Sequence, residues 1–119
     1  RGITGDEQGL ASLCKINQAI EQMYATLRMD YALGLKLPVL MQRRGLQCLT
    51  VENDVPLSMG GSGMATVMKM SAEQLREKYL ATGVVEQSDL ERYCRFADDP
   101  NSWAIYYATV AVSGRKVGG

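Results

Sequence analysis

Only two segments of this 119-residue chain have the character of β-strands, and that scarcity constrains the fold more than any other feature. Leu46–Asp54 has the length of a strand and carries apolar residues on both faces. Residues 103–112, WAIYYATVAV, are rich in aromatic and β-branched side chains, which favours a buried strand. Two strands cannot cover both of their own faces, and an isolated pair is marginal in water. We therefore expect a partner chain, a preceding N-terminal segment or a second copy of this chain to complete the sheet.

The first part of the chain has a helical pattern. Between residues 10 and 31, apolar side chains recur mostly at steps of three and four, which predicts one long amphipathic helix. A short second helix is expected to hold Pro38 in its first turn and to end at Gly45, which can adopt a left-handed conformation.

Two further helices are expected between the strands. Ser71 and Gln74 have the spacing of a capping box for the first of these, and Ser88 and Glu91 have it for the second. Residues 114–119 are interpreted as a fraying tail. The expected order of helix, helix, strand, helix, helix, strand is that of an α/β chain forming one unit over residues 1–119.

Composition excludes several classes of function. Thirteen Lys and Arg balance thirteen Asp and Glu with no run of either sign, so no basic patch indicates nucleic acid or an anionic membrane. The longest apolar run is far shorter than the ~20 residues that span a bilayer. Histidine is absent, which removes Ser-His and Cys-His nucleophiles and the commonest metal ligand. Three dispersed cysteines, interpreted as small buried residues, fit a reducing cytoplasm.

A glycine-rich loop, MGGSGMA at residues 59–65, precedes a helical pattern as phosphate-binding loops do. A P-loop needs Lys and Ser or Thr directly after its last glycine, but Met64 and Ala65 follow Gly63. A dinucleotide fingerprint needs a third glycine three positions after Gly63, and Thr66 stands there. We interpret the loop as a flexible connection or a mobile flap over a pocket rather than as a nucleotide site.

Several motifs resemble one enzyme family. The Gly-x-x-Leu-Pro step at Gly34, RRGL before the first strand, DPNSWA at residues 99–104 and the closing GRK are similar to the C-terminal portion of class I S-adenosylmethionine-dependent methyltransferases. The likeness is to the ubiquinone/menaquinone-biosynthesis-like group with its many natural-product enzymes, and it covers nearly the whole chain. It implies a Rossmann-like fold of which this chain holds helices and the last two, antiparallel strands.

The resemblance also implies what this chain lacks. That family holds its cofactor with a glycine-rich loop after the first strand and an acidic residue after the second, and no segment here matches either. S-adenosylmethionine is therefore expected in the complete enzyme and not on this chain alone. The active edge would receive the residues after the first strand and those that begin the second, with the end of the first helix as a roof. The substrate-binding residues expected there, for a small apolar or aromatic substrate, are Met23, Tyr24, Leu27, Met59, Trp103 and Tyr106.

No catalytic residue is assigned. Methyl transfer is an in-line attack on a sulfonium methyl group, so proximity and desolvation can supply much of the acceleration. Asp30, Glu52 and Asp54 are the nearest carboxylates, and we interpret them as solvated or capping groups rather than general bases. Two alternatives stay open: a non-catalytic methyltransferase-like binding or dimerisation protein, and a cofactor-independent cyclase or isomerase that uses the apolar pocket.

Overall fold

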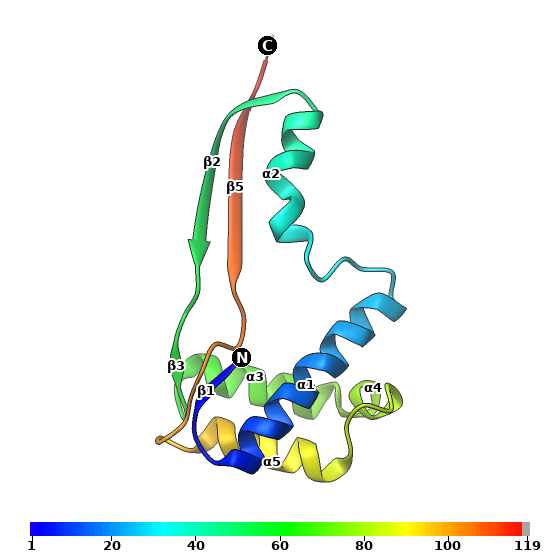
Figure 1. The fold of residues 1–119 in the computed structure, drawn as a ribbon, viewed down its shortest axis with the longest axis vertical. Helices are drawn as coiled ribbons and strands as arrows, with labels where there is room; N and C mark the ends of the chain where they lie inside the picture. Colours follow the sequence, from blue (N-terminus) through cyan, green and yellow to red (C-terminus); the bar gives the residue numbers. More distant parts are fainter. Residues whose placement is uncertain (118–119) are drawn as a thin grey trace.

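The structure, a computed structural model, describes residues 1–117 and shows a mixed α/β chain. The chain is elongated, with extents of 55, 30 and 20 Å, and has a helical body at one end and a narrow arm at the other (Figure 1). The elements in order are β1 (Gly2–Thr4), α1 (Glu7–Thr26), α2 (Leu33–Arg43), β2 (Leu46–Asp54), β3 (Ser58–Met59), α3 (Gly63–Gln74), α4 (Arg76–Ala81), α5 (Gln87–Asp98), β4 (Trp103–Ala104) and β5 (Thr109–Lys116).

The body is built around the packing of α1 against α5. The carboxylate of Asp6 caps α1 by accepting the backbone N–H of Gly9 at 2.9 Å. A buried stripe with helical spacing, Leu13, Ile16 and Ala19, then faces the core. A methyl group on Gly9 would lie 2.8 Å from the Phe96 ring, so this glycine sets the close approach of the two helices.

The long first helix ends earlier than the pattern predicts. The last helical residue is Thr26, and Arg28 takes a left-handed conformation with φ of 58°. Tyr31, which was expected in the helix, therefore lies in the connection to α2. Local hydrogen bonds from the Arg28 amide to the Ala25 carbonyl and from the Met29 amide to the Tyr24 carbonyl close the helix after Thr26, although the apolar spacing continues.

The caps of the later helices also differ from the expectation. Ser71 lies inside α3, which begins earlier with Ser62 as its cap, the Ser62 hydroxyl accepting the amide of Ala65. The capping box of α5 is formed by Glu86 and Asp89, not by Ser88 and Glu91. Asp89 also accepts a hydrogen bond from Ser12 of α1, so the residue that completes the capping box also joins α5 to α1.

The segment at residues 103–112 is two strands rather than one. β4 lies in the middle of a three-stranded antiparallel sheet, β1-β4-β3, inside the body. The chain leaves this sheet at Ile105, whose amide donates to the carbonyl of Arg1, and re-enters strand conformation at Thr109 in a different sheet. β5 then continues to Lys116, so the expected fraying tail begins too early; residues 118 and 119 lie outside the described part.

The arm consists of the antiparallel pair β2–β5 with α2 along one face (Figure 1). Pro38 lies inside α2, not in its first turn, because the helix begins at Leu33. A proline in a helix interior costs about 3 kcal/mol, and α2 nevertheless continues through Pro38 while it lies against both strands. Gly45 ends the segment with φ of 85°, as expected.

The two faces of the β2–β5 pair differ in polarity. Gly34 of α2 contacts Val110, so α2 covers the face that carries Val110, Val112 and Val51. The opposite face is exposed and mostly polar; it carries Thr50, Glu52, Asp54, Thr109, Ala111 and Ser113. The expectation that both faces need cover is therefore wrong. The outer edges of β2 and β5 are both open, because neither strand pairs with a third strand within residues 1–117.

Among the described residues, no helix combines the length and the apolar character that crossing a membrane requires.

Candidate functional site

The residues expected to bind substrate lie in three separate places. Met23, Tyr24 and Leu27 are near the end of α1, where they point in two directions because the helix turns by about 100° per residue. Met23 and Leu27, four residues apart, line a hollow of about 300 Å³ against Lys78 and Thr82 at the end of α4. Tyr24 belongs to a different hollow, described below.

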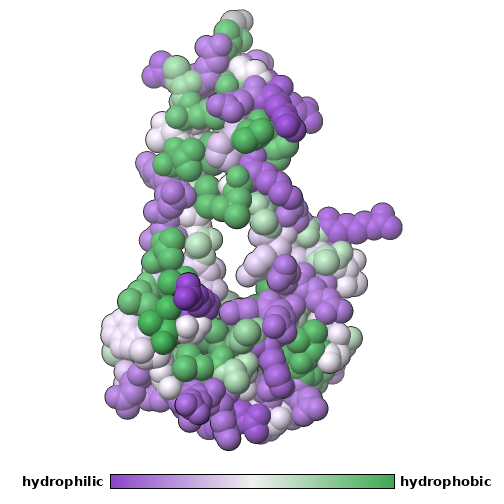
Figure 2. Space-filling view, viewed as in Figure 1, coloured by the Kyte–Doolittle hydropathy of each residue, from purple (hydrophilic) through white to green (hydrophobic). Residues whose placement is uncertain are grey.

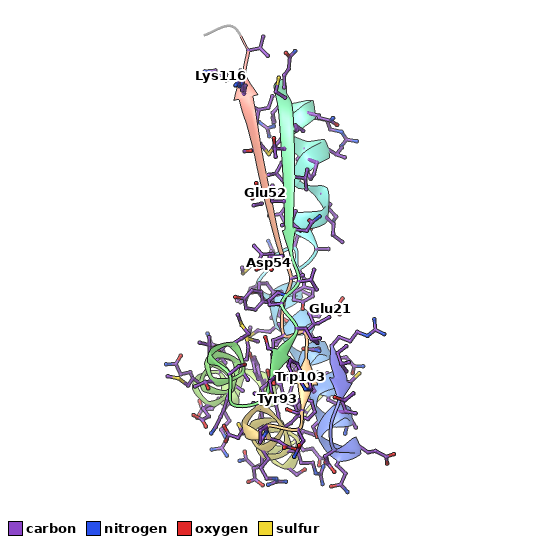
Figure 3. The ribbon with its side chains drawn as sticks, turned by 90° about the vertical axis from the view of Figure 1, so that its left-hand side faces the viewer. Glu21, Glu52, Asp54, Tyr93, Trp103 and Lys116 are labelled. Carbon is purple, nitrogen blue, oxygen red and sulfur yellow. The ribbon has the colours of Figure 1, made fainter. Side chains whose placement is uncertain are left out.

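Met59 and Trp103 form the second place. They lie directly opposite each other in the β3–β4 pair, and both side chains are about two-fifths exposed, at 41% and 39%. Figure 3 shows Trp103 on the body below the arm, well separated from Glu52 on β2. This pair forms an apolar surface on the three-stranded sheet, and neither residue lines any of the hollows described here.

Tyr106 lies in the third place, within the core of the body. Its side chain is only 7% exposed and its ring meets that of Tyr93 edge to face, with centroids 6.3 Å apart. The buried hydroxyl of Tyr106 has no hydrogen-bond partner in the structure. Burial raises the pKa of Tyr106, and it raises the pKa of Tyr93 still further. In this structure Tyr106 therefore belongs to the core, and the small exposed part of the residue contributes to the lining of a hollow of about 320 Å³ beside Arg1 and Glu21.

A hollow of about 460 Å³ lies where the body meets the arm, and we call it the tyrosine hollow. Its lining comes from the end of α1, the α1–α2 connection, the start of α2 and the start of β5. The rings of Tyr24 and Tyr31 meet edge to face at 5.4 Å. The full lining is Tyr24, Asp30, Tyr31, Ala32, Gly34, Leu35, Tyr107, Ala108 and Val110.

Of the substrate-binding residues predicted from the sequence, only Tyr24 belongs to this lining, together with Asp30, which was expected to be a solvated or capping carboxylate near the site. Sequence reasoning missed Tyr31 because that residue was assigned to the buried face of a longer helix, and Tyr107 because an unbroken strand was expected there. Recognising that the chain leaves one sheet after Ala104 would have indicated Tyr107, which is 45% exposed. The start of the expected second strand does contribute to the tyrosine hollow, but through Tyr107, Ala108 and Val110 rather than through Trp103.

The glycine loop has a structural role. The amide of Gly60 donates to the carbonyl of Ser102 at 3.0 Å, and the amide of Gly61 donates to that of Ala97 at 2.7 Å. A methyl group on Gly60 would lie 1.9 Å from the Asp99 carbonyl oxygen, so only glycine fits there. Because these amides already bond to the chain itself, they are not available to surround a phosphate.

The carboxylates of Asp30, Glu52 and Asp54 are not arranged as general bases. Asp30 accepts hydrogen bonds from Lys36 at 2.6 Å and from the amide of Ala32 at 2.9 Å, and these bonds hold the pKa of Asp30 below its ordinary value. Glu52 and Asp54 are exposed on the polar face of β2 (Figure 3).

The cysteines differ in part from their interpretation as buried residues. Cys14 and Cys48 are exposed, whereas Cys94 is half-buried, and burial raises the pKa of its thiol. Across residues 1–117, no three side chains of metal-ligating type gather closely enough to hold a metal ion.

Comparison of the chain with family models, with curated proteins and with solved structures finds no match.

Proposed function

We propose that this chain is the C-terminal portion of a small-molecule S-adenosylmethionine-dependent methyltransferase. It would form part of the substrate pocket and its lid, and a separate cofactor-binding part would complete the sheet. The resemblance of the motifs around Gly34 and at residues 99–104 suggests the family.

One observation carries the proposal: β2 and β5 form an antiparallel ladder that is open at both outer edges. Such edges present unpaired N–H and C=O groups to any strand that can align with them. A helix covers one face of the pair, as expected for a piece of a layered α/β sheet. The glycine loop bonds to the end of α5 and to Ser102 before β4, so in this proposal the nucleotide is bound by the other part.

The open edges also favour a second candidate, a dimerisation protein without catalysis. Two copies could pair their edges about a two-fold axis, since such an interface uses the same surface on both. Native mass spectrometry separates the two candidates. A symmetric homodimer of the 119-residue chain at micromolar concentration supports the second candidate.

The test of the first candidate is a calorimetric titration with S-adenosylmethionine. The 119-residue chain should show no binding in the micromolar range. The chain joined to the polypeptide encoded immediately before it in its gene should bind the cofactor with micromolar affinity. Binding to the 119-residue chain alone would contradict the proposal, and so would absence of binding to the folded joined protein.

A further inference from the structure

The far end of the arm gathers positive charges that lie far apart in the sequence. Arg43 and Arg44 end α2, and Arg115 and Lys116 lie at the end of β5. The cross-strand pairing of Leu46 with Lys116 brings the two pairs of basic residues together. Figure 3 shows Lys116 at the end of the arm that is farthest from the body. We call the four basic residues the arm tip.

The charges of the arm tip are not neutralised within the described part of the chain. All four residues are exposed, and none forms an ion pair with another of residues 1–117. Residues 31–51 and 100–117 contain no Asp or Glu. The nearest acidic residue along β2 is Glu52, opposite Ala111, and the stretch of β5 from Ala111 to Arg115 spans roughly 13 Å. That distance exceeds the screening length of about 8 Å at physiological salt, so the arm tip presents an unbalanced positive potential.

Apolar side chains lie next to these cations. Val39 and Leu40, in the last turns of α2, are 48% and 41% exposed, and Val117, next to Lys116, is 54% exposed. No residue of α2 is buried. Figure 2 shows hydrophobic and hydrophilic residues side by side at this end of the arm. Cations flanked by exposed aliphatic side chains are typical of surfaces that bind at the boundary of a membrane.

Roles within the chain explain only parts of the arm tip. Arg43 and Arg44 stabilise the negative end of the α2 dipole, and charged residues on β5 keep other strands away from its open edge. Neither role needs four cations in one place beside apolar residues. Nucleic acid is disfavoured as the partner, because α2, β2 and β5 contain no aromatic residue on which a base could stack. An anionic surface that also accepts aliphatic side chains accounts for both features.

We propose that the arm tip docks on a membrane surface that contains anionic lipids. The four cations contact the negatively charged headgroups, and the exposed valine and leucine side chains enter the boundary between headgroups and acyl chains. The body, at the opposite end of the molecule, points away from the membrane. This inference goes beyond the proposed function, since docking requires neither cofactor nor methyl transfer.

The experiment measures co-sedimentation of the 119-residue chain with lipid vesicles at low salt. Vesicles of phosphatidylcholine are compared with vesicles in which about one-third of the lipid is phosphatidylserine. We expect the chain to partition at least about tenfold more strongly onto the anionic vesicles. Salt at about 1 M, where the screening length is about 3 Å, should remove most of this difference. Equal binding to the two kinds of vesicle, or binding to neither, would overturn the proposal.

Paired substitutions localise the contact. The double variant Arg44→Gln, Arg115→Gln should weaken binding to the anionic vesicles about five- to twentyfold, because each cation near such a surface contributes about fivefold. The control, Arg28→Gln with Arg95→Gln, removes the same net charge from exposed positions away from the arm tip and should change binding by less than about twofold. Melting temperatures show whether each variant folds. Equal weakening by the two double variants would contradict docking through the arm tip.

Two further measurements test the other partners that a basic surface could have. A single-stranded DNA oligonucleotide at the same concentration of negative charge should bind more weakly than the anionic vesicles, and tighter binding would replace the membrane by nucleic acid. If the chain binds no vesicles and Arg44→Gln with Arg115→Gln dissociates a homodimer, the arm tip contacts a second copy and the membrane proposal is wrong. The cofactor titration is independent of all these results, so the two proposals fail separately.

Discussion

The ring of Tyr106 packs edge to face against the ring of Tyr93, 6.3 Å away, and its buried hydroxyl makes no hydrogen bond. A buried hydroxyl without a partner loses its bonds to water and gains nothing in return. The contact between the two rings thus stabilises the core, whereas the unpaired hydroxyl of Tyr106 destabilises it.

The first prediction follows from this orphan hydroxyl. Tyr106→Phe should leave the free energy of unfolding unchanged or raise it by up to about 2 kcal/mol, because the change removes only the unsatisfied group. Tyr106→Ala should lower it by about 3–5 kcal/mol through the cavity that it creates. Urea denaturation of the two variants measures both changes in the free energy of unfolding. A loss of stability in Tyr106→Phe would mean that the hydroxyl has a partner, such as a bound substrate or water.

The second prediction concerns alkaline pH. Burial raises the pKa of Tyr93 well above its value of about 10 in the unfolded chain, so the folded state holds this proton more tightly. The stabilisation is fully present below pH 10 and is lost as the pH rises toward the folded-state pKa. We expect the melting temperature to fall above about pH 10. Tyr93→Phe should make that fall shallower, and the exposed Tyr107→Phe should not change it.

The third prediction concerns the buried carboxylate of Asp89. Burial alone would raise the pKa of Asp89, but the Glu86 amide, the Lys15 ammonium and the Ser12 hydroxyl together hold it below its ordinary value. The folded pKa is depressed, so the stabilisation is present above the unfolded value of about 3.8 and is lost as the pH falls through the folded pKa.

At neutral pH, Asp89→Asn should therefore lower the free energy of unfolding by about 1–3 kcal/mol. The difference from the unmodified chain should shrink below about pH 3. Asp98→Asn is the matched control; Asp98 is an exposed carboxylate paired with Lys69, and the change should cost far less. An equal loss of unfolding free energy in the two variants would contradict the stabilising role of the buried Asp89 carboxylate.

The fourth prediction tests the role of the glycine loop. Gly60→Ala should lower the free energy of unfolding by about 3 kcal/mol or more, because its methyl group would collide with the Asp99 carbonyl oxygen. Gly63→Ala meets no atom within 4 Å and lies in the first turn of α3. It should be neutral or stabilising by up to about 1 kcal/mol. Equal tolerance of both changes would show that the loop does not pack as described.

Local chemistry made part of this fold predictable. The strand at Leu46–Asp54 and the left-handed turn at Gly45 are where the sequence pattern indicates them, because strand propensity and glycine conformation act over a few residues. The division of residues 103–112 between two sheets was not predictable, since it depends on β1 pairing with β4 from the far end of the chain. The capping box of α5 likewise includes Asp89, which accepts a hydrogen bond from Ser12, 77 residues away in sequence.

The candidate site was predictable only in outline. An apolar and aromatic lining near the end of the first helix was expected, and Tyr24 does line the tyrosine hollow. The contribution of Tyr31 arises from the helix end at Thr26, where local hydrogen bonds around the left-handed Arg28 close the helix. The contribution of Tyr107 arises from the strand break after Ala104. For the same reason Tyr106, one residue before Tyr107, was assigned to the site although its side chain lies in the core.

Amide hydrogen exchange of β2 and β5 tests the central claim, an unfinished sheet, most directly. In an antiparallel pair, alternate amides bond across the ladder and the others point to the outer edge. In the 119-residue chain, the outward amides of both strands should exchange almost as fast as in an unfolded peptide. In a protein that joins the chain to the proposed cofactor-binding part, the outward amides of at least one strand should become strongly protected. Outward amides that exchange at the same fast rate in both proteins would contradict the account.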